Sequence, residues 1–162
     1  MSDPGQMAPD IELRTPAGRL VSLRAAWSLG PVLVTFFKVA CPTCQLLFPY
    51  LEKLNRAYGA RGLTVLGISQ DDAEATLEFG SAKGATFPLL LDPEPFGVSR
   101  SYGISNVPAT FLVGKDGQVW ETLSGWSRSD VNSLADTIAR MVGVTPSAIS
   151  AEDDGAPAWK PG

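Results

Sequence analysis

Residues 31–44 read PVLVTFFKVACPTC, an apolar run that leads directly into two cysteines separated by two residues. The run over 31–37 is continuous and rich in β-branched and aromatic side chains, which is typical of a strand buried on both faces of a sheet. A helix is predicted to begin at Pro42, because proline suits the first helical position and apolar residues then recur at helical spacing. Cys41 is therefore expected where a buried strand passes into a helix.

The rest of the chain alternates between the two kinds of element. The predicted strands are 10–13, 19–23, 63–69, 87–91, 110–113 and 118–123, and the further helices are 72–83, 95–102 and 129–142. This order predicts an α/β fold with a mixed sheet between helices and a β-hairpin at the N-terminus. The helix after the cysteines should end at Gly59 and carry Glu52 and Arg56 as an i,i+4 pair on its outer face. The core pattern stops before Thr145, so we expect one domain over 1–144 and a C-terminal tail over 145–162.

The composition excludes several classes of function. The 162 residues carry a net charge of −4 and no cluster of Lys and Arg, which argues against nucleic acid as a partner. No segment approaches the about 18 apolar residues that cross a bilayer, and the polar start over 1–9 lacks the pattern of a signal peptide. We therefore expect a cytoplasmic protein with no membrane partner. The absence of histidine excludes a Ser-His-Asp or Cys-His mechanism and a histidine-based metal site.

Cys41 and Cys44 are the candidate catalytic residues. A thiol at a helix N-terminus with a Cys-X-X-Cys partner has a pKa lowered from about 8.5 to roughly 3.5–7.5. Cys41 is then expected to attack a substrate disulfide, and Cys44, one turn further and more buried, to resolve the mixed disulfide. Two alternatives remain open: an inert core pair, or half of a zinc site that only a dimer could complete. We expect no cofactor and no metal.

A second candidate element is Val107-Pro108, immediately before a predicted strand. An X-Pro bond at the entrance of a strand is either cis, which usually has a structural or functional reason, or an ordinary trans bond that opens an edge strand. The spacing alone leaves both open.

Several stretches together resemble the thioredoxin superfamily, and more closely the TlpA/ResA-type redoxins and the related AhpC/TSA group. They cover most of the chain: APDIEL at 8–13, the hairpin at 18–23, FFK with CPTC at 36–44, Pro49 in the helix, GIS at 67–69, FPLL at 87–90 and NVPAT at 106–110. The resemblance implies a thioredoxin-like three-layer sandwich and thiol–disulfide oxidoreductase activity. It also implies that Pro108 is cis and faces the cysteines. Pro42, Thr43, Val107 and Pro108 would then contact the substrate, whose backbone adds to this loop like a strand.

Three residues near the cysteines depart from the family's pattern, and two of these departures concern proton transfer. Ala40 stands where thioredoxins carry a tryptophan, Thr35 replaces their buried aspartate, and Leu47 replaces the helix glutamate of the ResA type. Asp71 or Asp72 could substitute for the missing carboxylate, or could simply cap the next helix. Lys38 could favour the thiolate of Cys41, or could extend from the end of the strand into solvent.

Three functions compete at this point. The first is a disulfide reductase that acts on protein or small-molecule disulfides or dithiols and receives electrons from a thiol donor. The second is a thiol-dependent peroxidase of the AhpC/TSA type, although Lys38 and Val34 stand where that chemistry requires Thr or Ser and Pro before Cys41. The third is a thioredoxin-fold binding or redox-sensing module without turnover.

Overall fold

The apolar run before the cysteines forms strand β3, and all six of its residues are buried. A computed structural model describes residues 1–162. The elements in chain order are β1 (Glu12–Arg14), β2 (Leu20–Ser22), α1 (Leu23–Trp27), β3 (Val32–Phe37), α2 (Pro42–Tyr58), the 3-10 turn η1 (Gly59–Arg61), β4 (Thr64–Ser69), α3 (Ala73–Ala82), β5 (Leu89–Leu91), α4 (Gly97–Ser101), β6 (Ala109–Val113), β7 (Val119–Ser124), β8 (Trp126–Ser127), α5 (Arg128–Met141) and β9 (Trp159–Lys160).

Strand β3 lies inside a seven-stranded sheet with the order β2-β1-β5-β4-β3-β6-β7. It pairs in parallel with β4 and antiparallel with β6, so the sheet is mixed, as predicted. Because β3 has a strand on each side and helices over each face, none of its residues faces water, and the sequence shows no alternation of apolar and polar residues. The predicted N-terminal hairpin is β1 and β2, at one edge of the sheet.

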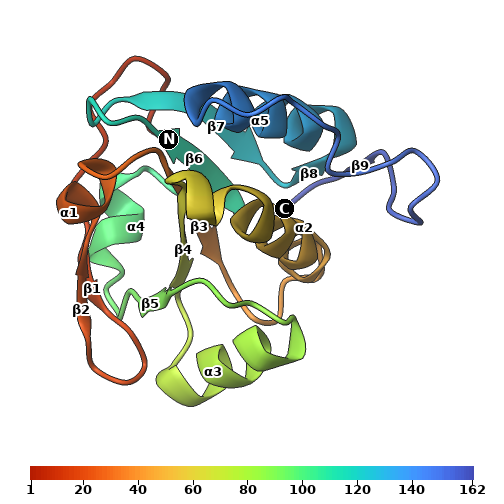
Figure 1. Cartoon of the computed structure of the whole chain (residues 1–162). Coiled ribbons are helices and arrows are strands. Elements are labelled where there is room, and N and C mark those ends of the chain that lie inside the picture. The colour runs from red at the N-terminus through yellow and green to blue at the C-terminus, as the bar shows by residue number, and fades with distance from the viewer.

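Helices cover both faces of the sheet (Figure 1). Leu33 and Phe37 of β3 point to the face on which α2, α3 and α5 pack. Val34 and Phe36, which point the other way, pack with residues of α1 and α4. The predicted three-layer arrangement is therefore confirmed, and it places the start of α2 at the end of β3.

Helix α2 is held against β3 close to the cysteine pair. Cys41 is its N-cap residue and Pro42 its first residue, and the helix ends where Gly59 begins η1. The ring centroids of Phe37 in β3 and Phe48 in α2 lie 4.6 Å apart. This contact fixes the first turns of α2 relative to the strand. With 17 residues α2 is the longest helix, and no helix is both long and apolar enough to cross a membrane.

Glu52 does not lie on the outer face of α2, so that prediction is wrong. Its ion pair with Arg56 is present at 2.8 Å, but only 8% of the Glu52 side chain is exposed. The backbone N–H and the hydroxyl of Thr86 donate hydrogen bonds to the Glu52 carboxylate. These donors compensate for the burial of the charge. Helical spacing could not show that the loop before β5 covers this turn.

Helix α1 was not predicted, because Leu23 was assigned to the second strand of the hairpin. The structure ends that strand at Ser22, whose side chain accepts a hydrogen bond from the backbone N–H of Ala25 and caps the helix. Five residues are too few to show a helical period in the sequence. Leu23 is fully buried and anchors α1 under the sheet.

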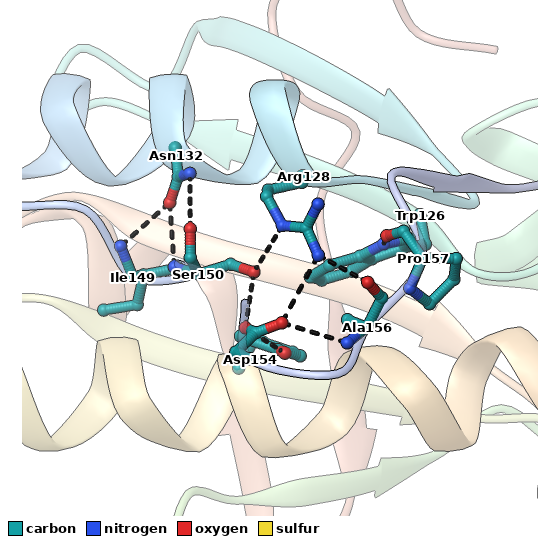
Figure 2. Close-up of polar contacts among 9 residues, drawn as sticks. Trp126, Arg128, Asn132, Ile149, Ser150, Asp154, Ala156 and Pro157 are labelled. Carbon is teal, nitrogen blue, oxygen red and sulfur yellow. Dashed lines mark hydrogen bonds and ion pairs between the residues drawn. The ribbon is translucent and has the colours of Figure 1, made fainter. Parts of the chain in front are cut away.

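The tail over 145–162 packs along α5 and α2 and is held by side-chain hydrogen bonds (Figure 2). Asn132 of α5 accepts from the backbone N–H groups of Ile149 and Ser150 and donates to the carbonyl of Ser150. The Arg128 guanidinium donates to Ser150 Oγ, to the Asp154 carboxylate and to the carbonyl of Ala156. These contacts fix the first half of the tail.

Two aromatic residues complete this attachment. The Tyr50 hydroxyl of α2 donates to Asp154 Oδ2 at 2.6 Å, and the indole N–H of Trp126 donates to the Pro157 carbonyl at 2.6 Å. We call Tyr50, Trp126, Arg128, Asn132 and Asp154 the tail clamp. Beyond it, β9 pairs antiparallel with β8, which brings the end of the tail back across the molecule.

Candidate active site

Cys41 lies at the N-terminus of α2, as predicted. Its backbone is extended, with φ −79° and ψ 114°, and its Sγ accepts a hydrogen bond from the backbone N–H of Cys44 at 3.1 Å. The sulfur thereby takes the place of the oxygen in an ordinary N-cap and satisfies one of the free N–H groups of the first turn. Cys41 is partly exposed, and both cysteines are free thiols.

Backbone and side-chain contacts hold the loop that presents Cys41. Asp71 Oδ2 accepts from the backbone N–H of Val39 at 2.8 Å, and the Gln45 side-chain amide donates to the Val39 carbonyl at 2.9 Å. The backbone N–H of Cys41 donates to the Lys38 carbonyl at 3.2 Å. The loop between β3 and α2 is thus tied both to β4 and to the first turn of the helix.

The structure separates the predicted modulators of the thiol pKa. Asp71 supports the loop at Val39, while Asp72 is the N-cap of α3 and accepts from the backbone N–H of Ala75 at 2.8 Å. Neither carboxylate hydrogen-bonds to a cysteine sulfur. Lys38 is exposed and lines a small hollow of about 170 Å³ together with Gln70 and the loop before β6. These placements give Asp71 and Asp72 local structural roles.

The Val107-Pro108 bond is cis, as the resemblance implied, and the loop faces Cys41. The thiol of Cys41 donates to the Val107 carbonyl oxygen at 3.5 Å. Pro108 is buried and stands immediately before β6, so Val107 is held at the end of the strand next to β3. A second cis bond, Glu94-Pro95, lies before α4 and was not predicted.

Cys44 is fully buried under the first turn of α2. Burial raises the pKa of its thiol well above the ordinary value, and hydrogen bonding and charge from the neighbouring Cys41 raise that pKa further. Cys44 therefore stays protonated near neutral pH while Cys41 is unreacted. Cys41 is thus the more accessible of the two thiols.

No carboxylate lies beneath the thiol pair. Thr35 of β3, at the position of the family's buried aspartate, shares a hydrogen bond of 3.0 Å with the hydroxyl of Thr110 in β6. The two buried carboxylates are engaged elsewhere, Glu52 with Thr86 and Asp92 with Ser99. The positions of the family's buried carboxylate, Thr35 and Leu47, thus carry no carboxylate in the structure.

One contact of the site was missed by the sequence. Thr43, the third residue of the CPTC stretch, is only 3% exposed, and its hydroxyl donates to the Pro161 carbonyl at 2.6 Å. Residue 161 belongs to the tail, which shows no periodic pattern and no motif. Its approach to Thr43 depends on the tail clamp and on β9, and neither has a signal in the sequence.

Known proteins resemble this chain over the whole site. The sequence matches the AhpC/TSA family over residues 4–122. It is 29% identical over 136 residues to the thiol-disulfide oxidoreductase ResA of Geobacillus thermodenitrificans (strain NG80-2), which covers 83% of this chain and 77% of the relative. It is 30% identical over 119 residues to the thioredoxin-like protein YneN of Bacillus subtilis (strain 168), which covers 71% of this chain and 68% of the relative.

The fold has a close structural counterpart. The crystal structure of a candidate thiol:disulfide interchange protein DsbE from Chlorobium tepidum superposes with a TM-score of 0.79 at 26% identity, covering 88% of this chain and 100% of the other. The thioredoxin-like fold that the resemblance implied is thereby confirmed. The family match includes both cysteines and Pro108, and it ends before the tail.

Proposed function

Because this chain belongs to the AhpC/TSA family and is a thiol–disulfide oxidoreductase of the thioredoxin superfamily, we propose that Cys41 and Cys44 are its redox pair. The observation that carries the proposal is the arrangement of the two sulfurs. Cys41 is partly exposed at the N-terminus of α2 and contacts the loop before Pro108, while Cys44 is buried one turn behind it.

Reduction of a substrate proceeds by two exchange steps. The Cys41 thiolate attacks one sulfur of the substrate disulfide, which forms a mixed disulfide and releases the other substrate sulfur as a thiolate. The Cys44 thiolate then attacks Cys41 Sγ, which closes the Cys41–Cys44 disulfide and releases the second substrate thiolate. The substrate gains two electrons and two protons, and a dithiol donor later returns two electrons to the protein.

The second step requires Cys44 to lose its proton. After burial, the hydrogen bond and the charge of Cys41 also raise the Cys44 pKa. This contribution disappears once Cys41 Sγ is bonded to a substrate sulfur. The thiolate released in the first step is a base formed beside Cys41, between the first turn of α2 and the loop before β6, which we take as the substrate groove. We infer that it, or water, accepts the proton in place of the family's buried carboxylate.

The same groove supplies the substrate contacts that we propose. Pro42 is exposed beside Cys41 and Val107 is partly exposed, while Thr43 and Pro108 are buried, Thr43 beneath the last residues of the tail. In this arrangement an extended segment of the substrate can run between the first turn of α2 and the loop before β6. The expected substrates are protein or small-molecule disulfides and dithiols.

We further propose that the protein acts as a reductase in the cytoplasm. The chain contains only two cysteines and both belong to the redox pair, so no disulfide contributes to the stability of the fold. Such sparing use of cysteine suits a reducing compartment. The reduction potential tests the direction: equilibration with glutathione should give a value below about −220 mV, whereas one near about −120 mV would identify an oxidant.

Turnover tests the proposed activity directly. In the insulin-reduction assay with dithiothreitol, the protein should accelerate precipitation, Cys41→Ser should abolish the acceleration, and Ala17→Ser in the distant β1–β2 turn should leave it unchanged. Absence of acceleration by the unmodified protein would favour a binding module. Peroxide consumption that exceeds disulfide reduction would favour the peroxidase.

A further inference from the structure

The last residues of the tail lie in the groove beside the candidate redox pair. The Pro161 carbonyl accepts the hydrogen bond of Thr43, which stands between Cys41 and Cys44. Gly162 packs so closely on the Val107 carbonyl that a Cβ at this position would collide with it. Val107 is also the residue whose carbonyl accepts from the Cys41 thiol. Residues 161 and 162 therefore contact both sides of the groove: Thr43, two positions after Cys41, on one side and Val107 on the other.

Gly125 forms a third contact surface for this segment. A Cβ on Gly125 would lie 2.7 Å from the Lys160 carbonyl oxygen and 2.9 Å from the Gly162 backbone nitrogen, so only glycine allows the tail to approach. Gly125 has φ +66° and donates its N–H to the Pro108 carbonyl at 2.9 Å. The tail thus crosses the backbone that carries the cis proline.

The form of the contact is that of an added strand. β9 pairs antiparallel with β8, with Trp126 opposite Lys160 and Ser127 opposite Trp159. β8 and β9 form a two-stranded sheet of their own, and an extended peptide that adds to a strand pairs through its backbone in the same way. A hollow of about 310 Å³ continues from Trp159 and Gly162 between Asn106 and Ser124, which leaves room for a longer segment along the same path.

We propose that residues 159–162 act as an internal occupant of the peptide-binding groove, which an extended segment of a protein substrate must displace before its disulfide reaches Cys41. The proposal rests on the proposed function of the cysteine pair. The tail clamp ends at Pro157, so segment 159–162 can leave the groove while the rest of the tail stays attached. Segment 159–162 is held by the two-residue strand β9, the Thr43–Pro161 hydrogen bond and packing on Gly125 and Val107, and its Trp159 side chain is 66% exposed.

Displacement would affect substrates according to their size. A protein substrate needs the backbone contacts that segment 159–162 already uses, whereas a small disulfide needs only access to Cys41. While the tethered segment occupies the groove, a protein substrate cannot bind. The apparent affinity for that substrate is therefore reduced to the fraction of molecules whose groove is free. The segment therefore favours small disulfides over folded or extended protein substrates.

Truncation after Ala158 tests the proposal, because it empties the groove and keeps the tail clamp. We expect kcat/KM for insulin to rise by roughly three- to tenfold, with a smaller change for 5,5′-dithiobis(2-nitrobenzoic acid). Gly162→Ala provides a milder variant, since its Cβ would collide with the Val107 carbonyl, and it should shift kcat/KM for insulin in the same direction. Asp153→Ala, at an exposed tail position, is the matched control and should behave as the unmodified protein.

A peptide supplied in trans gives an independent measurement. The heptapeptide APAWKPG, residues 156–162, should inhibit insulin reduction by the truncated protein and shift the amide signals of Thr43 and Gly125. Equal kcat/KM for insulin in the unmodified, truncated and Gly162→Ala proteins, each shown to be folded by circular dichroism, would overturn the proposal. If none of the three reduces insulin, the failure lies instead with the proposed function of the cysteine pair.

Discussion

The thiol site lies at the N-terminus of α2, while the tail clamp joins α2, β8 and α5 to the tail, and the two are built from different groups. At the thiol site the partners of Cys41 Sγ are the backbone N–H of Cys44 and the backbone carbonyl of Val107. In the tail clamp the partners are side chains, chiefly Arg128 and Asn132, which bind the backbone of the tail (Figure 2). At the thiol site, backbone groups contact the sulfur directly and the side chains of Asp71 and Gln45 hold only the loop before it, whereas in the clamp side chains make the contacts themselves.

This difference predicts how each region responds to substitution. The thiol site depends on two sulfur atoms, so the loss of either one should remove the chemistry without unfolding the protein. The clamp contains many hydrogen bonds of modest individual worth, so the loss of one should weaken the tail and leave the thiols active.

Cys44→Ser should reduce turnover by roughly two orders of magnitude or more, because the mixed disulfide on Cys41 can no longer be resolved within the protein. The variant should accumulate covalent complexes with substrate. Non-reducing gel electrophoresis detects them as bands that dithiothreitol removes, with the double variant Cys41→Ser/Cys44→Ser as control. A lane without such bands would contradict the proposed order of attack.

The two thiols should differ in reactivity by at least about tenfold near neutral pH, because burial raises the pKa of Cys44 and limits its access. Iodoacetamide labelling followed by peptide mass spectrometry should show Cys41 modified first, and modification of Cys44 should increase as the pH rises. If Cys44 were labelled before Cys41, the buried thiol would be the more reactive one, and the proposed difference in reactivity between the two cysteines would be wrong.

The sequence predicted the thiol site because its signals are local. The apolar run of β3, the proline at the start of α2 and the spacing of the cysteines all lie within 14 residues. The position and cis state of Pro108 came from the resemblance, since the spacing alone left both isomers open. The hydrogen bond of Asp71 to Val39, in contrast, joins residues 32 positions apart and leaves no pattern to recognise.

The tail clamp could not be predicted for the same physical reason. Tyr50 and Asp154 are 104 positions apart, and Thr43 and Pro161 are 118 apart. Polar contacts of this kind follow no period, and a stretch rich in proline, alanine, glycine and aspartate shows no apolar face. Only the three-dimensional arrangement shows that the segment predicted as a plain tail reaches the groove of the thiol site.

Asn132→Ala tests the clamp at its centre. The side chain makes three hydrogen bonds to the backbone of Ile149 and Ser150, and their loss should cost about 1–3 kcal/mol of unfolding free energy. Thermal denaturation should show a decrease in Tm of about 3–8 °C. Ser133→Ala, at an exposed position on the same helix, is the matched control. Small disulfides should still be reduced, and loss of that activity would show that clamp and thiols are not separable.

Asp154→Asn should give the smallest effect, because an amide keeps part of the hydrogen-bonding capacity of the carboxylate. Hydrogen bonds from Ser150, Tyr50 and the backbone of Ala156 hold the pKa of the Asp154 carboxyl below its usual value of 3.8. A lowered pKa in the folded state means that the ionised group stabilises tail attachment above pH 3.8, and that this contribution is lost as the pH falls through the folded-state pKa.

Lowering the pH through the folded-state pKa should therefore loosen the tail in the unmodified protein. In Asp154→Asn this acid step should be missing, because the side chain no longer ionises. The indole N–H of Trp126, which donates to the Pro157 carbonyl, reports tail attachment in a two-dimensional NMR titration. Asp153→Asn, at the adjacent exposed position, should retain the acid step. If Asp154→Asn titrates in the same way as the unmodified protein, then the charge of Asp154 does not contribute to tail attachment and hydrogen bonds alone hold the tail. The contrast with the thiol site, where two sulfur atoms carry the chemistry, would then be sharper still.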